Sequence, residues 1–340
     1  MKKVFLALAA VAAIAACSKS EVEYIPTNEI TFTPVAQNIT KAMMEGTTFT
    51  TTEEFNVWAF YNPTTTLAAD INAWVAEYVA AGDDAQIYLD DKTFAYDSNY
   101  SLWAGKENAY FWPKVGSLAF AGYHPSSVDA SYVLEGDQNQ MTFSDVLNSW
   151  VSAEAANTED LMYFNLTKGF VKNNVTAVFK HALSWLTVNV ATTEATVKAG
   201  ATITVSSVKF TEVMPQGDAT VVNQATIAWV PEGTADVVET VAAPAELTTT
   251  VQKLKEPLLI PQGMEGNLEV TYTIASEDSA EFTEKKVLKL NELKDKEDNA
   301  LSAWEPAKHY IYNIVISTEE ILIDASVENW AEVEIPVEVK

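Results

Sequence analysis

Apolar and polar residues alternate along most of the chain, and this pattern is the main structural signal in the sequence. Strands that bury one face have a period of two, whereas amphipathic helices have a period of 3.6 residues. From about residue 175 the alternating runs become rich in Val, Thr and Ile, with Gly, Pro, Asn and Asp between them. Strands are expected at 55–63, 91–97, 109–113, 117–125, 175–190, 201–210, 224–230, 256–263, 267–276, 285–293, 309–317 and 320–330. Short strands separated by turn residues predict an all-β sandwich fold.

One stretch has helical spacing instead. Between Leu67 and Ala81 the large apolar side chains recur on one face of a helix, Asp70 lies near its first turn, and Gly82 follows its end. We expect the aromatic residues of this face to pack on the sheet. The pattern also allows a second short helix around 145–151, so one or two short helices are expected in the N-terminal part.

The composition divides the chain into two halves. A polar link at 172–174 separates mixed strands from the Val-, Thr- and Ile-rich strands. A length of 340 residues suits about two domains. The prediction is therefore an N-terminal β-sandwich domain at 42–172 and a C-terminal one at 173–340.

The first residues have the pattern of a lipoprotein signal peptide, assigned here to residues 1–17. Lys2 and Lys3 precede an apolar run at 4–16 that is too short to span a membrane, and Ile14-Ala15-Ala16-Cys17 forms a lipobox-like end. Cys17 is the single cysteine, so no intrachain disulfide can form. We expect its thiol to carry a lipid such as palmitate. An ordinary signal peptide with a chance cysteine is the alternative.

Residues 18–41 are predicted to be a polar tether followed by one short strand. Apolar residues alternate with threonines until Pro34, after which the apolar positions continue with the opposite parity. Because Pro cannot donate a ladder hydrogen bond, this strand belongs at a sheet edge or contains a bulge. The apolar residues expected to hold the strand in place are Ile30, Phe32, Val35 and Ile39.

The bond between Lys41 and Ala42 follows this strand directly. A strand that is tethered upstream and followed by a basic residue could be cut off after folding, provided that the bond lies in an exposed loop. A Lys between Thr and Ala is also common without any processing. The removable strand is therefore a hypothesis about residues 18–41.

The last ten residues, 331–340, form a second isolated strand pattern. Four apolar side chains lie on one face, and Glu residues with Pro336 lie on the other. Burying four such side chains is worth on the order of 6–12 kcal/mol as an upper bound. The apolar residues are Val333, Ile335, Val337 and Val339. This segment either pairs within its own C-terminal domain or is donated to another subunit.

The charge excludes several classes of function. The formal net charge is −26, from 21 basic and 47 acidic residues, and every basic residue is Lys. A polyanion repels nucleic acid and anionic lipid head groups. Without Arg there is no bidentate clamp for phosphate, which argues against nucleotide chemistry.

No catalytic or metal-binding constellation stands out. His124, His181 and His309 each lie in or beside apolar runs without a partner at metal-ligand spacing, which favours core or turn positions. Acidic clusters, such as the one at 295–298, lack the turn Gly and closing Glu of a calcium loop. The prediction is a protein that is not an enzyme and needs no cofactor or metal.

Several short motifs recur in one order along almost the whole chain. They are Ile30-Thr31-Phe32 with Thr40-Lys41-Ala42, Phe111-Trp112-Pro113, the run 118–125, Asp160-Leu161-Met162-Tyr163, the run 178–183, the run 304–312, and Val327-Glu328-Asn329-Trp330. In this order they resemble the fimbrillin family of Gram-negative surface pilins, the type V pilins. The chain departs from that family pattern at two positions, because Ala307 stands where Gly is usual and Lys41 where Arg is often found.

The resemblance implies two transthyretin-like β-sandwich domains and export as an outer-membrane lipoprotein on Cys17. It also implies a cut between Lys41 and Ala42, loss of the first strand, and polymerisation when the C-terminal strand of another subunit replaces it. The expected product is a stalk or tip subunit of a surface-exposed fimbria that supports adhesion. Its expected partners are copies of itself or related pilins, and possible surface receptors.

Other functions remain open from sequence alone. The chain could be a fimbrial anchor that is never cut, or a monomeric surface lipoprotein that binds glycan on exposed aromatics such as Trp74, Trp103 or Trp150. A glycoside hydrolase is a more distant alternative and would need a cleft with paired carboxylates.

Overall fold

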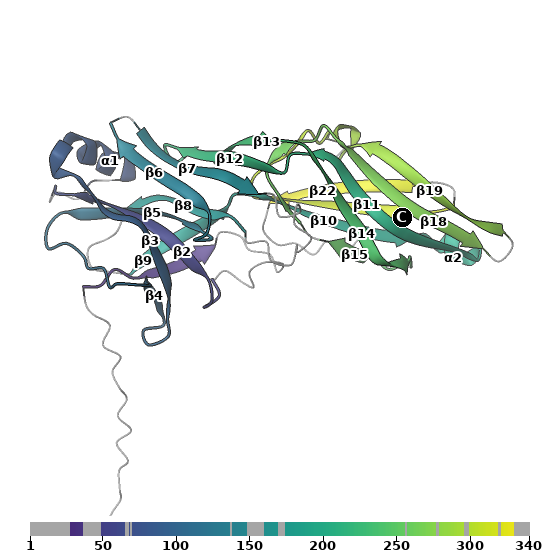
Figure 1. Cartoon of the computed structure of the whole chain (residues 1–340), viewed down its shortest axis with the longest axis horizontal. Coiled ribbons are helices and arrows are strands. Elements are labelled where there is room, and N and C mark those ends of the chain that lie inside the picture. Colours follow the sequence, from purple (N-terminus) through teal and green to yellow (C-terminus); the bar gives the residue numbers. More distant parts are fainter. Residues whose placement is uncertain are drawn as a thin grey trace, which may run out of the picture.

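The computed structural model describes residues 28–36, 49–64, 68, 70–136, 138–147, 160–168, 174–255, 257–276, 279–295, 299–318 and 321–329. Strands form most of this structure, and the molecule is elongated, with α1 near one end and the long strands β18 and β19 at the other (Figure 1). The predicted all-β class is confirmed.

Seven strands near the N-terminus close into a barrel. In barrel order they are β1 (Phe32–Ala36), β4 (Leu102–Gly105), β3 (Gln86–Asp97), β2 (Glu54–Asn62), β5 (Ser117–His124), β8 (Met162–Lys168) and β9 (Val175–His181). β5 is buried along its whole length, because its even-numbered residues from Leu118 to Phe120 face the barrel interior while its odd-numbered residues from Ala119 to Tyr123 face a second layer. A strand covered on both faces has a continuous apolar sequence, as 118–123 has.

The second layer is a four-stranded sheet that covers one side of the barrel. Its order is β13 (Ala228–Glu232), β12 (Gln216–Val222), β7 (Gln138–Leu147) and β6 (Asp129–Glu135). Phe143 of β7 and Val221 of β12 pack with Trp58, Tyr123 and Tyr163 of the barrel in one apolar cluster. The layer thus joins strands from two distant parts of the sequence.

The C-terminal half is a sandwich of two sheets. One has the order β15 (Gln252–Lys255), β10 (Ser184–Thr192), β21 (Lys308–Ile316) and β22 (Ile321–Asn329), with β16 (Leu258–Leu259) also paired to β10. The other has the order β14 (Ala235–Glu246), β11 (Ala201–Val213), β18 (Asn267–Ser276) and β19 (Ser279–Lys289). A two-stranded piece, β17 (Gln262–Gly263) and β20 (Ala303–Trp304), completes it. Tyr312 from the first sheet and Phe210 from the second lie 5.5 Å apart, ring centre to ring centre, in the shared core.

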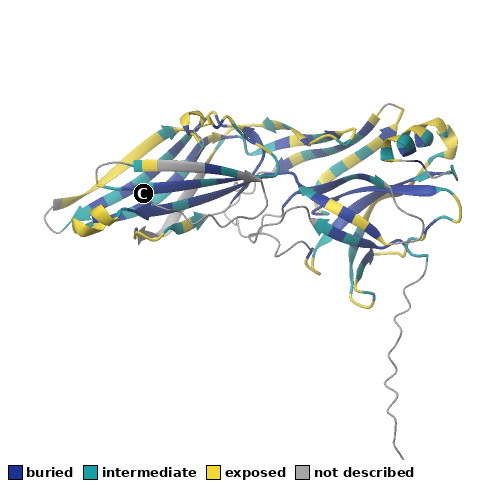
Figure 2. Cartoon of the chain, turned by 180° about the vertical axis from the view of Figure 1, so that it is seen from behind, coloured by how far each residue is buried: buried dark blue, intermediate teal, exposed yellow. Residues whose placement is uncertain are grey.

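Burial follows this architecture. Buried residues run along the inner faces of the strands, and exposed ones gather on the turns and on the outer strand β19 (Figure 2).

The helix predicted between residues 67 and 81 is confirmed as α1 (Ile71–Ala80). Asp70 caps it, its carboxylate accepting a 2.9 Å hydrogen bond from the Ala73 amide, and Gly82 follows it with a φ of 56°, which favours glycine. Trp74 and Tyr78 are its buried residues, so the aromatic face packs inward as expected.

The second helix, expected around 145–151, is wrong for residues 145–147, which belong to β7; residues 148–151 lie outside the described part. β12 pairs with β7 through Gln216↔Leu147 and Gly217↔Val146, so cross-strand hydrogen bonding overrides the local pattern. The short helix α2 (Glu194–Lys198) was not predicted. One-turn 3₁₀ helices lie at Gly82–Asp84 and Leu290–Glu292.

Most predicted strands are present, several of them only in part: the strand expected at 224–230 begins at Ala228, 256–263 holds the two short strands β16 and β17, and 285–293 ends in the 3₁₀ helix at Leu290–Glu292. Two others differ more. Residues 109–113 make only a single bridge, Phe111 to Glu29, because Tyr110 and Trp112 flank the first strand rather than joining a ladder. The run 175–190 is two strands, since β9 ends at His181 and β10 begins at Ser184 in a different sheet.

The boundary near residue 172 stays a prediction. β9, which follows this boundary, closes the N-terminal barrel, and the β12–β13 hairpin pairs with β7. Within the described residues, no helix is both long enough and apolar enough to cross a membrane.

Candidate functional site

The first strand, β1, is the feature that the sequence singles out, and it is held on both edges. On one side it runs parallel to β9, in register from Phe32↔Val175 to Ala36↔Phe179. On the other it pairs with β4 at Phe32↔Trp103. Upstream of β1, the Ile30 amide donates to the Tyr110 carbonyl (2.7 Å), and the Trp112 amide donates to the Asn28 carbonyl (2.9 Å). We call these surroundings of residues 28–36 the β1 seat: β9, β4 and residues 110–112.

Backbone direction alternates along β1. The Val175 amide donates to the Thr31 carbonyl at 2.8 Å, which places the backbone groups of odd-numbered β1 residues toward β9. Even-numbered residues therefore direct theirs toward β4. The backbone nitrogen of Pro34 therefore points toward β4, but β1 pairs with β4 only at Phe32. Because no β1–β4 hydrogen bond is formed at Pro34, the lack of an amide hydrogen there costs no ladder bond. This explains how a strand that closes a barrel can contain a proline.

Phe32 lies in the middle of the barrel core. Its side chain is fully buried, and its ring contacts four others edge-on or tilted, at centroid distances of 4.8–6.4 Å. These partners are Phe55, Phe94, Phe120 and Phe164. Ile30 is also fully buried in the same cluster. β1 therefore contributes a central part of this core.

Gly122 shows how tightly the barrel wall is built around these rings. A Cβ atom at this position would lie 2.4 Å from the Asn56 carbonyl oxygen and 2.4 Å from the Phe164 ring. Only glycine lets β2 and Phe164 approach β5 so closely.

The upstream end of the β1 seat is unfavourable for a negative charge. Burial, and secondarily the Asp97 carboxylate, raises the pKa of Glu29 above its ordinary value. Glu29 itself is only half-buried. Both effects disfavour a carboxylate at this position, and the Asp97 charge would in addition repel any other acidic group placed there.

The described chain resumes at Phe49, which also packs at the barrel. Phe49 is almost fully buried, and its ring lies 4.6 Å from Phe179, the β9 residue opposite the end of β1. It also lies 5.3 Å from the His124 ring. The two described segments on either side of residues 37–48 thus meet at one end of β9.

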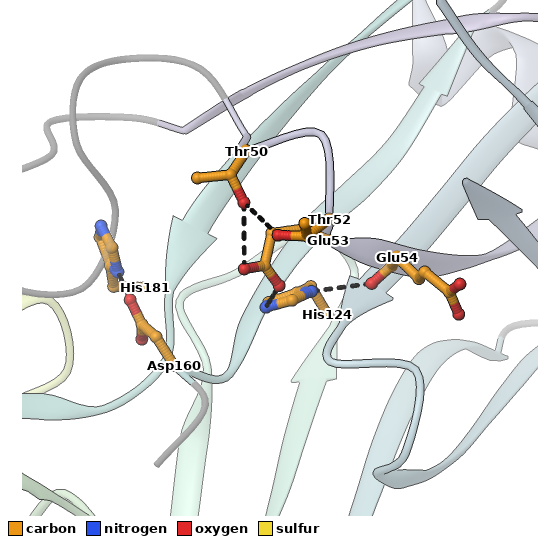
Figure 3. Close-up of polar contacts among 7 residues, drawn as sticks. All are labelled: Thr50, Thr52, Glu53, Glu54, His124, Asp160 and His181. Atoms are coloured by element: carbon orange, nitrogen blue, oxygen red, sulfur yellow. Dashed lines mark hydrogen bonds and ion pairs between the residues drawn. The ribbon is translucent and has the colours of Figure 1, made fainter. Parts of the chain in front are cut away.

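A polar cluster anchors the chain just after Phe49 (Figure 3). The Thr50 hydroxyl donates to Glu53 at 3.3 Å, and the other Glu53 oxygen lies 3.5 Å from Nε2 of His124. Nδ1 of His124 lies 2.8 Å from the Glu54 carbonyl oxygen, so Nδ1 is the donor. This cluster holds the start of β2 independently of β1.

The other two histidines also lie in the core. Nδ1 of His181 is 2.5 Å from an Asp160 oxygen, with both side chains buried. His309 stacks on Trp185 at 3.5 Å, and burial, with the Lys253 charge second, lowers its pKa to about 4. Among the described residues, no three His, Cys, Asp or Glu side chains are grouped to hold a metal ion.

The predicted site residues fall into two groups. Ile30 and Phe32 lie in the barrel core, and Val35 is half-buried with the opposite parity. Cys17, Ile39, Lys41, Ala42, Val333, Ile335, Val337 and Val339 lie outside the described residues. Residues of the β1 seat such as Trp103 and Tyr110 were not predicted, because their role depends on strand neighbours that no local pattern specifies.

The alternative of glycan binding on exposed aromatic residues is contradicted at two of the three tryptophans named for it. Trp74 is fully buried, and Trp103 is only 5% exposed. Trp150 lies outside the described residues. Buried rings cannot stack on a sugar, so Trp74 and Trp103 serve packing instead.

Together these features define an all-β protein in which the first strand completes a barrel. A family model described as fimbrillin-like matches residues 40–330, and the chain belongs to this family. Membership points to a structural, fimbrial role at the cell surface rather than to an enzyme.

Solved structures with low sequence identity share the fold. A fimbrial protein from Bacteroides vulgatus has a TM-score of 0.59 at 13% identity, over 89% of this chain and 100% of the other. A candidate cell adhesion protein from Bacteroides uniformis has a TM-score of 0.51 at 15% identity, over 89% and 99%. Another from Parabacteroides distasonis has a TM-score of 0.50 at 11% identity, over 92% and 100%. No curated protein matches the sequence.

Proposed function

We propose that this protein is a subunit of a cell-surface fimbria that polymerises by strand exchange. In this proposal it is exported as a lipoprotein on Cys17, cut between Lys41 and Ala42, and loses β1. The 331–340 segment of another subunit, with its four apolar side chains, then fills the β1 seat. The polymer supports adhesion.

The observation that carries the proposal is the position of β1. Phe32 and Ile30 lie in the barrel core, and among the strands that the structure describes β1 alone lies between the edges of β4 and β9. Removing β1 would expose these two edges and an aromatic cavity. An exposed edge beside an apolar groove is the surface on which an added strand binds most strongly.

The described chain around the proposed cut supports a clean separation. Ala36 ends β1 opposite Phe179, and Phe49 packs against the same Phe179. After a cut at Lys41, residues 49–54 would stay in place through Phe49 and the His124 cluster. β1 would then be held by non-covalent contacts alone.

The test uses the chain from residue 18 onward, treated with a Lys-specific protease and run unheated on a denaturing gel. The expected result is a ladder of multimers once mass spectrometry shows a new N-terminus at Ala42. Two matched controls should give no ladder: Lys41→Gln, which blocks the cut, and a chain ending at Trp330, which lacks the donor. A complete cut at Lys41 without multimers from the full-length chain would refute strand exchange.

The N-terminus of protein taken from the cell surface gives a second test. Mass spectrometry is expected to find a start at Ala42. A lipidated Cys17 in the final product would instead support an uncut anchor or a monomeric surface lipoprotein.

A further inference from the structure

We propose that the donated segment 331–340 runs antiparallel to β9, opposite in direction to the β1 strand that it replaces. This inference rests on the proposed function, because it concerns how the tail of a second copy fits the β1 seat. It follows from two facts: which β9 residues direct their backbone N–H and C=O groups into the seat, and where Pro336, which has no N–H group, lies in the tail.

The β9 edge of the seat has a defined pattern. Val175, Ala177 and Phe179 are buried toward the barrel core, and the Val175 amide bonds to β1. In a strand, residues that share a face also direct their backbone groups to the same side. These three residues therefore offer both their side chains and their backbone groups to the occupant of the seat.

Pro336 distinguishes the two directions of insertion. The apolar residues of the tail, such as Ile335 and Val337, must face the core, so Pro336 faces outward in either direction. If the tail ran parallel to β9, as β1 does, its outward residues would have to donate to β9. Pro336 has no amide hydrogen, so the carbonyl of Val175 or Ala177 would lose its partner in the middle of the ladder.

Reversing the strand while keeping its apolar face inward exchanges its two hydrogen-bonding edges. In the antiparallel direction the core-facing residues bond to β9, and Pro336 is directed toward β4. We place Ile335 opposite Ala177, so that Val333 and Val337 lie opposite Phe179 and Val175, and Pro336 falls level with Thr176. Thr176 lies one residue past Val175, the β9 partner of Phe32, and Phe32 is the one β1 residue that pairs with β4. The missing N–H group of Pro336 therefore costs no hydrogen bond to β4.

Charge favours the same direction. Lys180 lies at the Phe179 end of β9, and Asp97 acts electrostatically on the Glu29 position at the other end. Antiparallel insertion brings Glu332 toward Lys180 and Lys340 toward the Glu29 position. Parallel insertion brings Lys340 toward Lys180 and Glu332 toward the acidic end, which are like-charge contacts.

Disulfide trapping tests the direction, because the chain beyond Cys17 contains no cysteine. One copy carries an acceptor cysteine, Asn174→Cys or Lys180→Cys, and the other a donor cysteine, Glu332→Cys or Glu338→Cys. All four side chains lie on the outward face of their strands. Two cysteines at positions that face each other across the two strands therefore come within bridging distance, whichever direction the tail runs. The mixed copies are cut, assembled and oxidised, and the cross-linked dimer is quantified.

Antiparallel insertion predicts dimer from 332 with 180 and from 338 with 174. The opposite two combinations should give about tenfold less, because six residues of strand separate the sites by roughly 20 Å. Dimer from 332 with 174 and from 338 with 180 would overturn the direction but leave strand exchange standing. Multimers without any of the four cross-links would show that the tail does not occupy the seat in this register and would overturn the inference.

A proline variant gives an independent measurement. In the antiparallel direction, Pro336→Ala regains no bond to β9, so the temperature at which the ladder dissociates on the gel should stay within a few degrees. Parallel insertion predicts a clear rise, since Ala would restore the missing ladder bond. Val337→Ala is the matched control and should lower the dissociation temperature in either case, because its side chain faces the core.

Discussion

Phe32→Ala is the substitution that most directly probes the role of β1. The Phe32 ring is fully buried and touches Phe55, Phe94, Phe120 and Phe164 at centroid distances of 4.8–6.4 Å. Truncating a buried Phe costs about 3–5 kcal/mol of unfolding free energy, through lost transfer energy and the cavity that remains. Since typical proteins are stable by about 5–15 kcal/mol, this loss is readily measured.

The assay is urea unfolding of the uncut chain, followed by circular dichroism. Val35→Ala is the control, because Val35 lies on the opposite face of β1 and is half-buried, so its loss should stay near 1 kcal/mol. A Phe32→Ala unfolding free energy within 1 kcal/mol of the parent would refute the claim that β1 completes the barrel core.

The same substitution has a second consequence once the chain is cut. If β1 is then held by contacts alone, losing 3–5 kcal/mol weakens its retention by about 10²–10³-fold or more. Assembly after the cut should therefore start sooner in Phe32→Ala than in the parent, although the uncut chain is less stable. A slower or unchanged start would show that release of β1 does not limit assembly.

Three further predictions concern the rest of the fold. Ala307→Gly should stabilise the protein by about 0.5–1 kcal/mol in urea unfolding, because Ala307 has a φ of 56°, where an alanine side chain is strained; Ala228→Gly in β13 should destabilise it instead. Asp70→Ala should cost about 1 kcal/mol by removing the cap of α1, whereas Asp70→Asn should retain most of it. His309 has a folded pKa of about 4, below the usual value near 6.5, so the unfolded chain binds more protons between these limits, and stability should fall as the pH drops from 6.5 to 4. His309→Gln should reduce that slope by up to about 3 kcal/mol across the window, and an unchanged slope would contradict the assignment.

Many elements of this protein are determined by local sequence. The strand predicted at 55–63 is present as β2 (Glu54–Asn62), although it is buried on both faces, and α1 follows from its 3.6 spacing, the Asp70 cap and Gly82. The burial of Ile30 and Phe32 also agrees with their period-two pattern. These features depend on neighbours within a few residues, which is why a linear pattern predicts them.

Only the tertiary structure decided which strands became neighbours. That β1 lies between β4 and β9, that the β12–β13 hairpin crosses to β7, and that residues 145–147 extend a strand all depend on pairings between residues far apart in sequence. The burial of Trp103 likewise follows from its place opposite Phe32. A strand pattern specifies a face and a parity but not a partner, because backbone hydrogen bonds are the same for every sequence, and the choice among partners belongs to the packing of the whole core.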